Sequence, residues 1–362
     1  MKAAVARAFN APLAIEEVDL APPGPGEVEI RIRACAICHS DLMFIAGAWG
    51  GDLPAIWGHE AAGEVIAAGE GVDDLQPGDR VALTLIRSCG GCACCQAGQR
   101  TYCTESFPLS AKTPLRDVSG APVTQGLKCA AFAERAVAHR SQLAPIGERI
   151  GWAEASLLAC GVITGHGAVT NTAKMPAGAR AVVIGAGGVG LNAVQGAALS
   201  GASPLIAVDI SATRLETARE FGATHCVKAG PEAAKEVKRI LGGGLNVGAD
   251  YVFVTVGSTE AMGSAYRMLA PGGAAVLVGM AASGELSTFD PLILSDAGRR
   301  IIGSKMGSSV IERDIPALVR SYLDGRLKLD ELVTGRFALH EINEALDRTR
   351  AGIGVRNVIL FD

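Results

Sequence analysis

The sequence predicts an α/β protein in which a β-rich domain is combined with a domain built on a doubly wound parallel sheet. Alternating strands and turn signals fill roughly the first 150 residues, and strands alternate with helices after about Gly161. A glycine-rich turn separates the first strand of this second region from its helix. At 362 residues the chain is also long for a single hydrophobic core, so two domains are expected.

The β-rich part shows its clearest strand at residues 27–34. Val28, Ile30 and Ile32 alternate there with charged side chains, which is the pattern of a half-exposed antiparallel strand. Proline–glycine turns punctuate the rest of this part. The tail of the chain returns to mixed structure and ends in a strand at 357–361.

The second part alternates strands with helices, which predicts a parallel sheet. Strands are expected at 181–184, 205–208, 251–256 and 274–279, and helices at 189–200 and 212–221. We therefore expect one domain from residues 1–161 and 304–362, and a second domain at 162–303 inserted between its parts. The active site is expected in the cleft between these domains.

The composition excludes several kinds of partner. The net charge is −4 and no long basic run occurs, so neither nucleic acid nor an anionic membrane is expected. Residues 181–208 are uncharged and long enough for a bilayer, but their glycines, Asn192, Gln195 and Pro204 favour a buried strand–helix–strand unit. Because the N-terminus lacks the apolar core of a signal peptide, we expect a cytoplasmic protein. With nucleic acid and membrane not expected as partners, a small molecule is the expected substrate.

Four of the ten cysteines form a compact pattern. Cys89, Cys92, Cys95 and Cys103 lie in the run CGGCACCQAGQRTYC, and four thiolates can complete a tetrahedral zinc shell. Cys94 lies in the same run, so the choice of the four ligands stays open. Disulfides are disfavoured in the cytoplasm, and an iron–sulfur site usually has a different return spacing. The run therefore predicts a structural zinc that orders the loop.

A second set of ligand residues is spread along the chain. Cys38, His59 and Cys160 offer two thiolates and one imidazole, which leaves the fourth position of a zinc ion open for substrate. A metal in such a site favours loss of hydride from an alcohol, or polarises an aldehyde in the reverse direction. Taken singly, Cys160 could be a small core residue, His59 a structural histidine, and Cys35 with Cys38 a redox pair. Their combination favours a catalytic zinc.

Three neighbours of these ligands are candidates for supporting roles. The Ser40 hydroxyl can lie beside the reacting oxygen and pass on its proton. Asp41 can hold the ring of His59 and set its tautomer. Glu60 can act as a supporting carboxylate or as a transient ligand.

The glycine-rich turn reads Gly185-Ala186-Gly187-Gly188-Val189-Gly190 and satisfies G-x-G-x-x-G. The pattern is weak alone, but a strand precedes it, a helix follows it, and the next strand ends at Asp209, as in a dinucleotide-binding Rossmann domain. The glycines let the backbone approach a pyrophosphate at the helix N-terminus. Asp209 should accept hydrogen bonds from the adenosine ribose and would repel a 2′-phosphate, so NAD is expected rather than NADP.

These motifs resemble the zinc-containing medium-chain dehydrogenase/reductase superfamily over essentially the whole chain, in particular its formaldehyde dehydrogenase and aryl-alcohol dehydrogenase branches. The resemblance is carried by the cysteine loop, by residues 161–174, and by Gly58-His59-Glu60 followed by Gly63, Gly69 and Val72. It implies a GroES-like fold for the β-rich domain, two Zn²⁺ per subunit, NAD, and a homodimer or homotetramer. The implied catalytic residues are Cys38, His59 and Cys160 as zinc ligands and Ser40 as the proton relay. The implied further cofactor contacts are His39, Thr164, Val189, Arg214 and Arg356.

Three residues bear on the substrate within this superfamily. Polyol dehydrogenases usually carry glutamate where this chain has Cys160, which points to the alcohol branch. Phe107 stands where glutathione-dependent enzymes have an arginine, and together with Trp49 it favours an apolar or aryl primary alcohol. We therefore predict an NAD-dependent zinc alcohol dehydrogenase. The alternatives are a thiol-adduct (formaldehyde-type) dehydrogenase, an aldehyde reductase, and a non-enzymatic regulatory protein that binds zinc and NAD.

Overall fold

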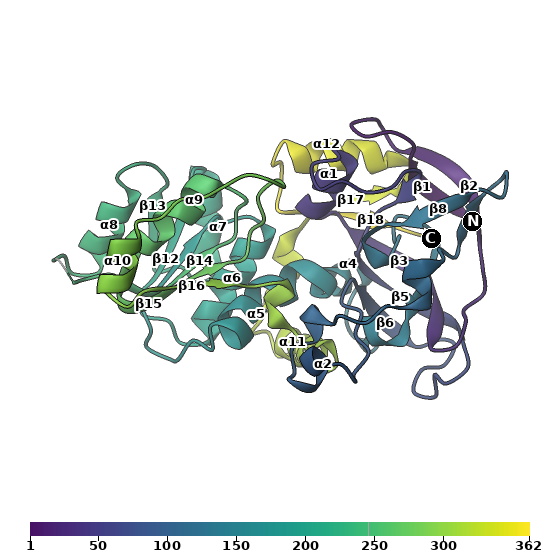
Figure 1. Cartoon of the computed structure of the whole chain (residues 1–362), viewed down its shortest axis with the longest axis horizontal. Coiled ribbons are helices and arrows are strands. Elements are labelled where there is room, and N and C mark those ends of the chain that lie inside the picture. The colour runs from purple at the N-terminus through teal and green to yellow at the C-terminus, as the bar shows by residue number, and fades with distance from the viewer. Residues whose placement is uncertain (245) are drawn as a thin grey trace. The chain divides into compact units, whose positions relative to one another are not determined.

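The structure, a computed structural model, describes residues 1–244 and 246–362 and divides into two compact units (Figure 1). The first unit comprises Met1–Gly161 and Val310–Asp362, and the second comprises Val162–Ser309. Residues 304–309 were expected in the first domain but belong to the second unit. The reason is hydrogen bonding: Thr172 Oγ1 lies 2.8 Å from the hydroxyls of both Ser304 and Ser308, and the Ser309 hydroxyl donates to the carbonyl of Ile163.

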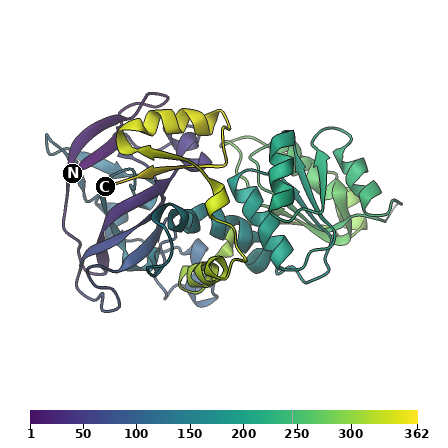
Figure 2. The same ribbon diagram turned by 180° about the vertical axis from the view of Figure 1, so that it is seen from behind.

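The first unit is rich in β-structure. A closed barrel contains β1 (Lys2–Ala6), β2 (Ala14–Leu20), β7 (Leu115–Asp117), β8 (Pro122–Gln125) and β4 (Ala55–Ile56). A seven-stranded sheet has the order β10 (Leu143–Pro145), β6 (Arg80–Thr84), β5 (Glu60–Ala68), β3 (Glu27–Ala36), β18 (Arg356–Leu360) and β17 (Val333–Ala338), with β9 (Arg135–His139) also paired to β3. In Figure 2 the yellow C-terminal strands lie beside the purple N-terminal ones, so the chain returns to its first unit at the end.

Strand β3 is the centre of this unit. It pairs antiparallel with β5, β9 and β18, and Val28, Ile30 and Ile32 are completely buried on one side of it, as the alternation predicted. The helices of the unit are α1 (His39–Ile45), α2 (Ala93–Gln96), α3 (Pro108–Ala111), α4 (Trp152–Leu157), α11 (Ile311–Leu323) and α12 (Ile342–Arg350). The C-terminal tail was expected to have mixed structure and to end in a strand, and the structure places α11, β17 and α12 before the final strand β18.

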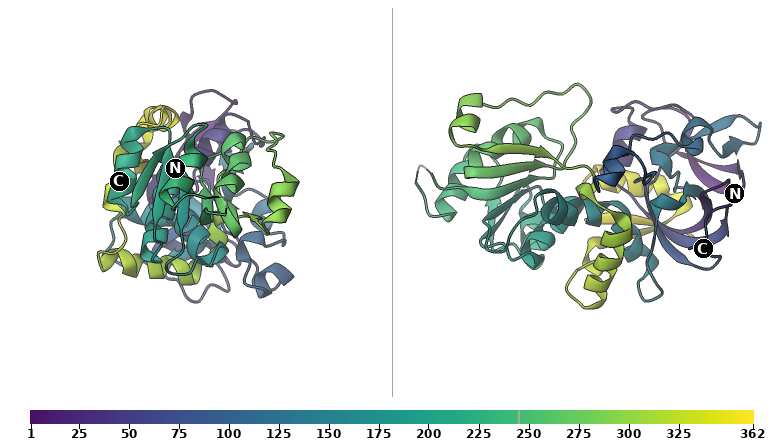
Figure 3. Two further views of the ribbon diagram at one scale, coloured as in Figure 1. Left: turned by 90° about the vertical axis from the view of Figure 1, so that its left-hand side faces the viewer. Right: turned by 60° about the horizontal axis from the view of Figure 1, so that its bottom comes forward.

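The second unit is built on a six-stranded sheet in which all neighbouring strands are parallel. The order is β13 (His225–Lys228), β12 (Leu205–Asp209), β11 (Ala181–Ile184), β14 (Ala249–Val254), β15 (Leu269–Leu277) and β16 (Arg300–Gly303). Its helices are α5 (Ile163–Gly167), α6 (Gly188–Leu199), α7 (Ala212–Glu220), α8 (Ala233–Ile240), α9 (Thr259–Ala265) and α10 (Pro291–Asp296), and Figure 3 shows helices on both faces of the sheet. This is the predicted doubly wound fold, with its topological switch between β11 and β14.

The uncharged stretch 181–208 forms β11, α6 and β12, as the strand–helix–strand interpretation required. Throughout residues 1–244 and 246–362, every helix is too short or too polar to cross a membrane.

Candidate metal and cofactor sites

Cys38, His59 and Cys160 converge in the first unit, although they come from three separate segments. Cys38 immediately precedes α1, His59 immediately precedes β5, and Cys160 lies in a π-helical turn after α4. One ligand atom from each lies within 4.8 Å of those of the others, and all three residues are buried. His59 Nε2 is buried and lacks a hydrogen-bond partner among the described residues. Two thiols beside an unpaired imidazole nitrogen fit a zinc ion with one open position.

Asp41 organises this cluster from the third position of α1. Its carboxylate accepts hydrogen bonds from the Cys38 amide (2.9 Å) and the Gly58 amide (3.1 Å), and lies 3.1 Å from Nδ1 of His59. Burial by itself would lower the pKa of His59, but the Asp41 charge, this hydrogen bond and the neighbouring Cys38 raise that pKa to about 10. The imidazole is therefore protonated at neutral pH in the metal-free protein, and a metal must displace its Nε2 proton.

Zinc uptake at this cluster should consequently depend on pH. Below a pKa of about 10, zinc competes with the His59 proton in addition to any thiol protons of the cluster, so affinity should rise by at least about tenfold per pH unit between about pH 7 and pH 9. Competition with a zinc chelator, starting from protein stripped of this metal, would measure the slope. In Asp41→Asn the slope above about pH 7 should be smaller by one proton, because the His59 pKa returns toward about 6.5. Equal slopes in the two proteins would show that His59 is already neutral in the unmodified protein.

Glu60 is not part of the ligand cluster, but its carboxylate contacts the segment that carries Cys160. Its carboxylate accepts a 2.7 Å hydrogen bond from the amide of Gly161, the residue after Cys160, and pairs with the guanidinium of Arg356. Both side chains are buried. A contact between Arg356 and a cofactor pyrophosphate would have to compete with this ion pair.

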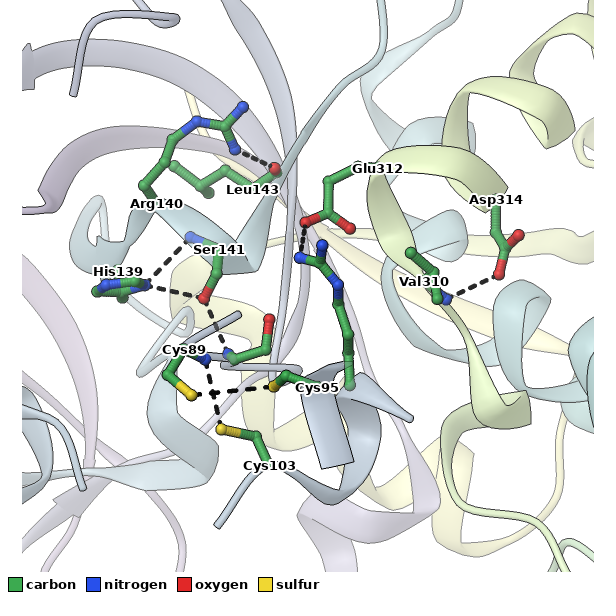
Figure 4. Close-up of polar contacts among 12 residues, drawn as sticks. Cys89, Cys95, Cys103, His139, Arg140, Ser141, Leu143, Val310, Glu312 and Asp314 are labelled. Atoms are coloured by element: carbon green, nitrogen blue, oxygen red, sulfur yellow. Dashed lines mark hydrogen bonds and ion pairs between the residues drawn. The ribbon is translucent and has the colours of Figure 1, made fainter. Parts of the chain in front are cut away.

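The four predicted cysteines of the loop also converge, and Figure 4 shows three of them, Cys89, Cys95 and Cys103. The sulfur atoms of Cys89, Cys92, Cys95 and Cys103 lie within 4.8 Å of one another, and Cys94 is outside this group. Backbone amides point at the sulfurs: Cys92 N–H donates to Cys89 Sγ (3.2 Å) and Cys89 N–H donates to Cys103 Sγ (3.4 Å). Hydrogen bonds from the Thr104 and Cys95 amides lower the pKa of Cys92 to about 6. Four thiols of which one is readily ionised fit a closed zinc shell.

The lobe around these cysteines is tied to the rest of the unit by polar contacts (Figure 4). Arg100 pairs with Glu312 of α11 at 2.6 Å, and the Ser88 amide donates to the hydroxyl of Ser141 at 2.9 Å. Phe107 packs edge-on against His139 with ring centroids 4.8 Å apart, and the guanidinium of Arg87 lies 5.6 Å from its ring. The Phe107 ring therefore packs against His139 and Arg87 at the cysteine lobe.

Trp49 belongs to a different aromatic group. Its ring meets Phe44 of α1 edge-on at 5.4 Å, and Phe44 stacks on Trp57 at 5.0 Å. Trp57 lies two residues before His59 and is buried, with an indole N–H that has no hydrogen-bond partner in the described part of the chain. No pattern in the sequence pointed to Trp57.

The glycine-rich turn has the geometry that a dinucleotide requires. Gly185 has φ +94°, and a Cβ on Gly190 would lie 1.8 Å from the carbonyl oxygen of Gly185, so both positions demand glycine. A Cβ on Gly187 would meet nothing within 4 Å, which leaves open space at the start of α6. Gly188 and Val189 form the first turn of that helix, whose N-terminus favours an anion.

Asp209 ends β12 and holds this turn. Its carboxylate accepts hydrogen bonds from the amides of Ala186 (2.6 Å) and Ser211 (2.8 Å). Each oxygen retains a lone pair for a ribose hydroxyl. The hydrogen bond from the Ala186 amide to Asp209 was not predicted, because it joins the end of β12 to the turn that follows β11. Arg214 lies in the first turn of α7, just after Asp209.

The remaining predicted residues lie at two helices. His39 and Ser40 begin α1 directly after Cys38; His39 is exposed and Ser40 is partly buried. Thr164 is buried in α5, where its hydroxyl contacts the sulfur of Met306 at 3.7 Å. The missed contact from Asp41 to the Cys38 amide had a local signal, since an acid three residues into a helix is typical of a capping box.

Comparison with known proteins agrees with both units. A family model for the alcohol dehydrogenase GroES-like domain matches residues 24–148, and one for zinc-binding dehydrogenases matches residues 188–323. An alcohol dehydrogenase zinc-binding domain protein from Burkholderia ambifaria is 34% identical, with a TM-score of 0.94 over 100% of this chain and 98% of that one. Benzyl alcohol dehydrogenase from Acinetobacter calcoaceticus is 31% identical, with a TM-score of 0.92 over 100% and 99%.

A further solved structure, of a zinc-binding dehydrogenase from Sinorhizobium meliloti, holds NADP and is 27% identical, with a TM-score of 0.82 over 99% of both chains. The two family models and the two more similar structures agree with the zinc motifs and with the fold of each unit. The chain belongs to the zinc-containing medium-chain dehydrogenase/reductase superfamily and is an oxidoreductase of the zinc-binding alcohol dehydrogenase type.

Proposed function

We propose that this protein is an NAD-dependent zinc alcohol dehydrogenase that interconverts a primary alcohol and its aldehyde. The observation that carries the proposal is the buried convergence of Cys38, His59 and Cys160 around an imidazole nitrogen without a partner. These residues would hold a catalytic zinc. Cys89, Cys92, Cys95 and Cys103 would hold a second, structural zinc.

Bound at the first cluster, zinc supplies a Lewis acid that polarises the oxygen of the alcohol or aldehyde. Asp41 keeps the His59 ring oriented through Nδ1, which leaves Nε2 as the ligand atom. Ser40, two residues after Cys38, would take the proton from the substrate hydroxyl. Glu60 would keep the Cys160 segment in place through the Gly161 amide.

NAD supplies the hydride acceptor and is assigned to the second unit. The glycine turn Gly185–Gly190 would receive its pyrophosphate at the start of α6. Asp209 would accept hydrogen bonds from the adenosine ribose hydroxyls. Arg214, five residues later in the chain, is assigned to the same ribose. We further assign His39 to the cofactor phosphates, Thr164 and Val189 to the nicotinamide side, and Arg356 to the pyrophosphate if it leaves Glu60.

Replacing Asp209 with asparagine should weaken the preference for NAD over NADP. The loss of one charge-assisted hydrogen bond to ribose and of repulsion toward a 2′-phosphate should shift the ratio of kcat/KM values by at least about tenfold. Steady-state kinetics with both coenzymes measure it. Asp290→Asn is the matched control, because Asp290 also accepts backbone amides in the same unit. An unchanged coenzyme ratio in Asp209→Asn would contradict the assignment.

An apolar or aryl primary alcohol is the substrate class that we favour. The name of the similar Acinetobacter calcoaceticus enzyme includes benzyl alcohol, and the rings of Trp49, Phe44 and Trp57 gather on the segments that flank Cys38 and His59. Aromatic walls suit planar apolar substrates.

The deciding experiment is a substrate screen that follows NADH absorbance, with zinc content measured on the same sample. We expect two zinc ions per subunit and a higher kcat/KM for benzyl-type than for short alcohols. Equal rates for both classes would refute the aryl assignment, and activity only with added glutathione would favour a thiol-adduct dehydrogenase. Activity confined to aldehydes would indicate a reductase, and zinc without turnover would favour a regulatory protein.

We also propose that the protein forms a homodimer or homotetramer in the cytoplasm. Strand β16 is the edge of the six-stranded sheet, and Ile301 on it and Leu292 on α10 are 38% and 73% exposed. An exposed apolar edge strand is a template for pairing with a second copy. Light scattering should give at least twice the monomer mass, and Ile301→Lys should shift it toward the monomer. A monomeric unmodified protein would overturn the proposal.

A further inference from the structure

Arg87 is a buried cation at the base of the cysteine lobe and is only 3% exposed. Its guanidinium donates to Gln142 Oε1 (2.7 Å), Ser110 Oγ (3.1 Å), Gln125 Oε1 (3.3 Å) and the Lys128 carbonyl (3.1 Å). All four of these acceptors are neutral. Burying a charge against neutral acceptors is unfavourable. The guanidinium offsets this cost by donating to four acceptors at once, which a smaller, neutral side chain could not do. We therefore ask which part of the backbone these hydrogen bonds stabilise.

The structure in question is the turn that contains Lys128. Leu127, Lys128 and Ala130 all have left-handed backbone conformations, with φ of +52°, +64° and +53°. Residues other than glycine rarely adopt this region, and such strain persists only where the surroundings enforce it. The turn is therefore held by contacts from outside.

Gln142 supplies the second of those contacts. It is completely buried, and its amide nitrogen donates to the carbonyls of Lys128 (3.1 Å) and Thr84 (2.9 Å). The Lys128 carbonyl thus receives donors from both Arg87 and Gln142, and these two side chains are bonded to each other. We call Arg87, Gln142 and the Lys128 carbonyl the buried clamp.

The strained turn leads directly to the backbone that presents His59. The Ala131 amide donates to the Gly58 carbonyl (3.0 Å) and the Phe132 amide donates to the Trp57 carbonyl (2.9 Å). These bonds fix the two residues immediately before His59.

We propose that Arg87 is a positioning residue for the His59 site: through the buried clamp it holds the strained turn, which in turn fixes Trp57 and Gly58. Since Arg87 lies two residues before Cys89, the clamp also connects the cysteine lobe to the catalytic cluster. The inference rests on the proposed zinc site of Cys38, His59 and Cys160.

The clamp is tested with Arg87→Met in the full-length zinc protein. Hydrogen exchange of the Ala131 and Phe132 amides should accelerate by about tenfold or more, because the turn opens more often. Loss of zinc from the catalytic cluster to a chelator should also accelerate by about tenfold, while the zinc of the cysteine lobe is retained. Arg80→Met is the matched control, since Arg80 donates to the carbonyls of Glu148 and Ile150 elsewhere in the unit. It should change neither rate.

Lys128→Gly separates positioning from general packing. Lys128 is exposed, and glycine adopts φ +64° without strain. A turn with glycine at this position therefore depends less on hydrogen bonds from Arg87 and Gln142. Adding Lys128→Gly to Arg87→Met should reverse part of the acceleration of zinc loss, because Leu127 and Ala130 keep their left-handed conformations. If Arg87→Met does not fold, the same pair of measurements is made on Arg87→Lys, which keeps the charge but not the planar fork of donors.

The outcomes are distinct. Unchanged exchange at Ala131 and Phe132 would overturn the clamp, and accelerated exchange with unchanged zinc retention would overturn its link to His59. Failure of Lys128→Gly to reverse any of the acceleration would assign Arg87 to packing alone, against the proposal. An unmodified protein that binds no zinc at the cluster would instead refute the proposed function, while the exchange measurement would still report on the clamp.

Discussion

Replacing Cys160 with alanine should remove one zinc ion per subunit and nearly abolish alcohol oxidation. Cys160 is one of the three residues of the buried cluster that we propose to hold the catalytic zinc, so its loss leaves one thiol and one imidazole for a metal. Because a Lewis acid contributes several kcal/mol of transition-state stabilisation, kcat/KM should fall by roughly 10³-fold or more. Zinc analysis and steady-state kinetics on the same preparation measure both effects.

Cys35→Ala is the control for this substitution. Cys35 is also fully buried in the first unit but lies outside the ligand cluster. This variant should keep two zinc ions per subunit and change kcat/KM by less than about threefold, since removing a small buried side chain away from the site mainly affects stability. If Cys160→Ala retained both metals and its activity, the three-ligand site would be wrong.

Replacing Cys95 with serine should disorder the cysteine lobe without emptying the catalytic cluster. Cys95 is the buried member of the four, and without metal its burial raises the pKa of the thiol to about 12. Zinc binding must therefore supply the free energy that ionises this thiol and orders the loop. Removal of the ligand should release one zinc, and trypsin should cut after Arg100 on the order of 100-fold faster.

Cys94→Ser tests which cysteines are used. Cys94 adjoins Cys95 but lies outside the group of four sulfurs, so this variant should keep its zinc and its resistance to trypsin. Loss of zinc in Cys94→Ser and not in Cys95→Ser would reverse the assignment. If trypsin cut both variants at the rate of the unmodified protein, the lobe would be ordered by contacts such as Arg100–Glu312 rather than by metal.

The centre of the Rossmann unit was predictable because its signals are local: four of the six strands and the helices α6 and α7 were expected, whereas β13, β16, α5, α8, α9 and α10 were not. Strand β11 covers the predicted 181–184, and α6 and α7 begin within one residue of expectation. Continuous apolar runs form buried parallel strands, and the glycines mark backbone positions where a side chain would clash. The boundary after residue 303 was not predictable, because it depends on hydroxyl contacts between residues 304–309 and the helical segment near Thr172.

In the candidate sites, too, the features with local sequence signals were predicted and those that depend on distant contacts were not. Residue type and spacing predicted the seven cysteine and histidine residues that the structure brings together in two clusters, since the donor atoms that zinc accepts are few. The supporting contacts were only partly foreseen. Asp41 was expected to hold His59 but also binds the Cys38 and Gly58 amides, and Arg356 was expected at the cofactor but pairs with Glu60.

The sequence by itself determined the α/β class, the candidate donor residues and the glycine turn, because each follows from residue type and local pattern. Only the tertiary structure decided that Cys38, His59 and Cys160 meet, that Cys94 stands apart, and that the buried guanidinium of Arg87 donates to the Lys128 carbonyl. These outcomes join residues far apart in the chain. Such contacts depend on how the whole chain packs, so no local sequence pattern specifies them.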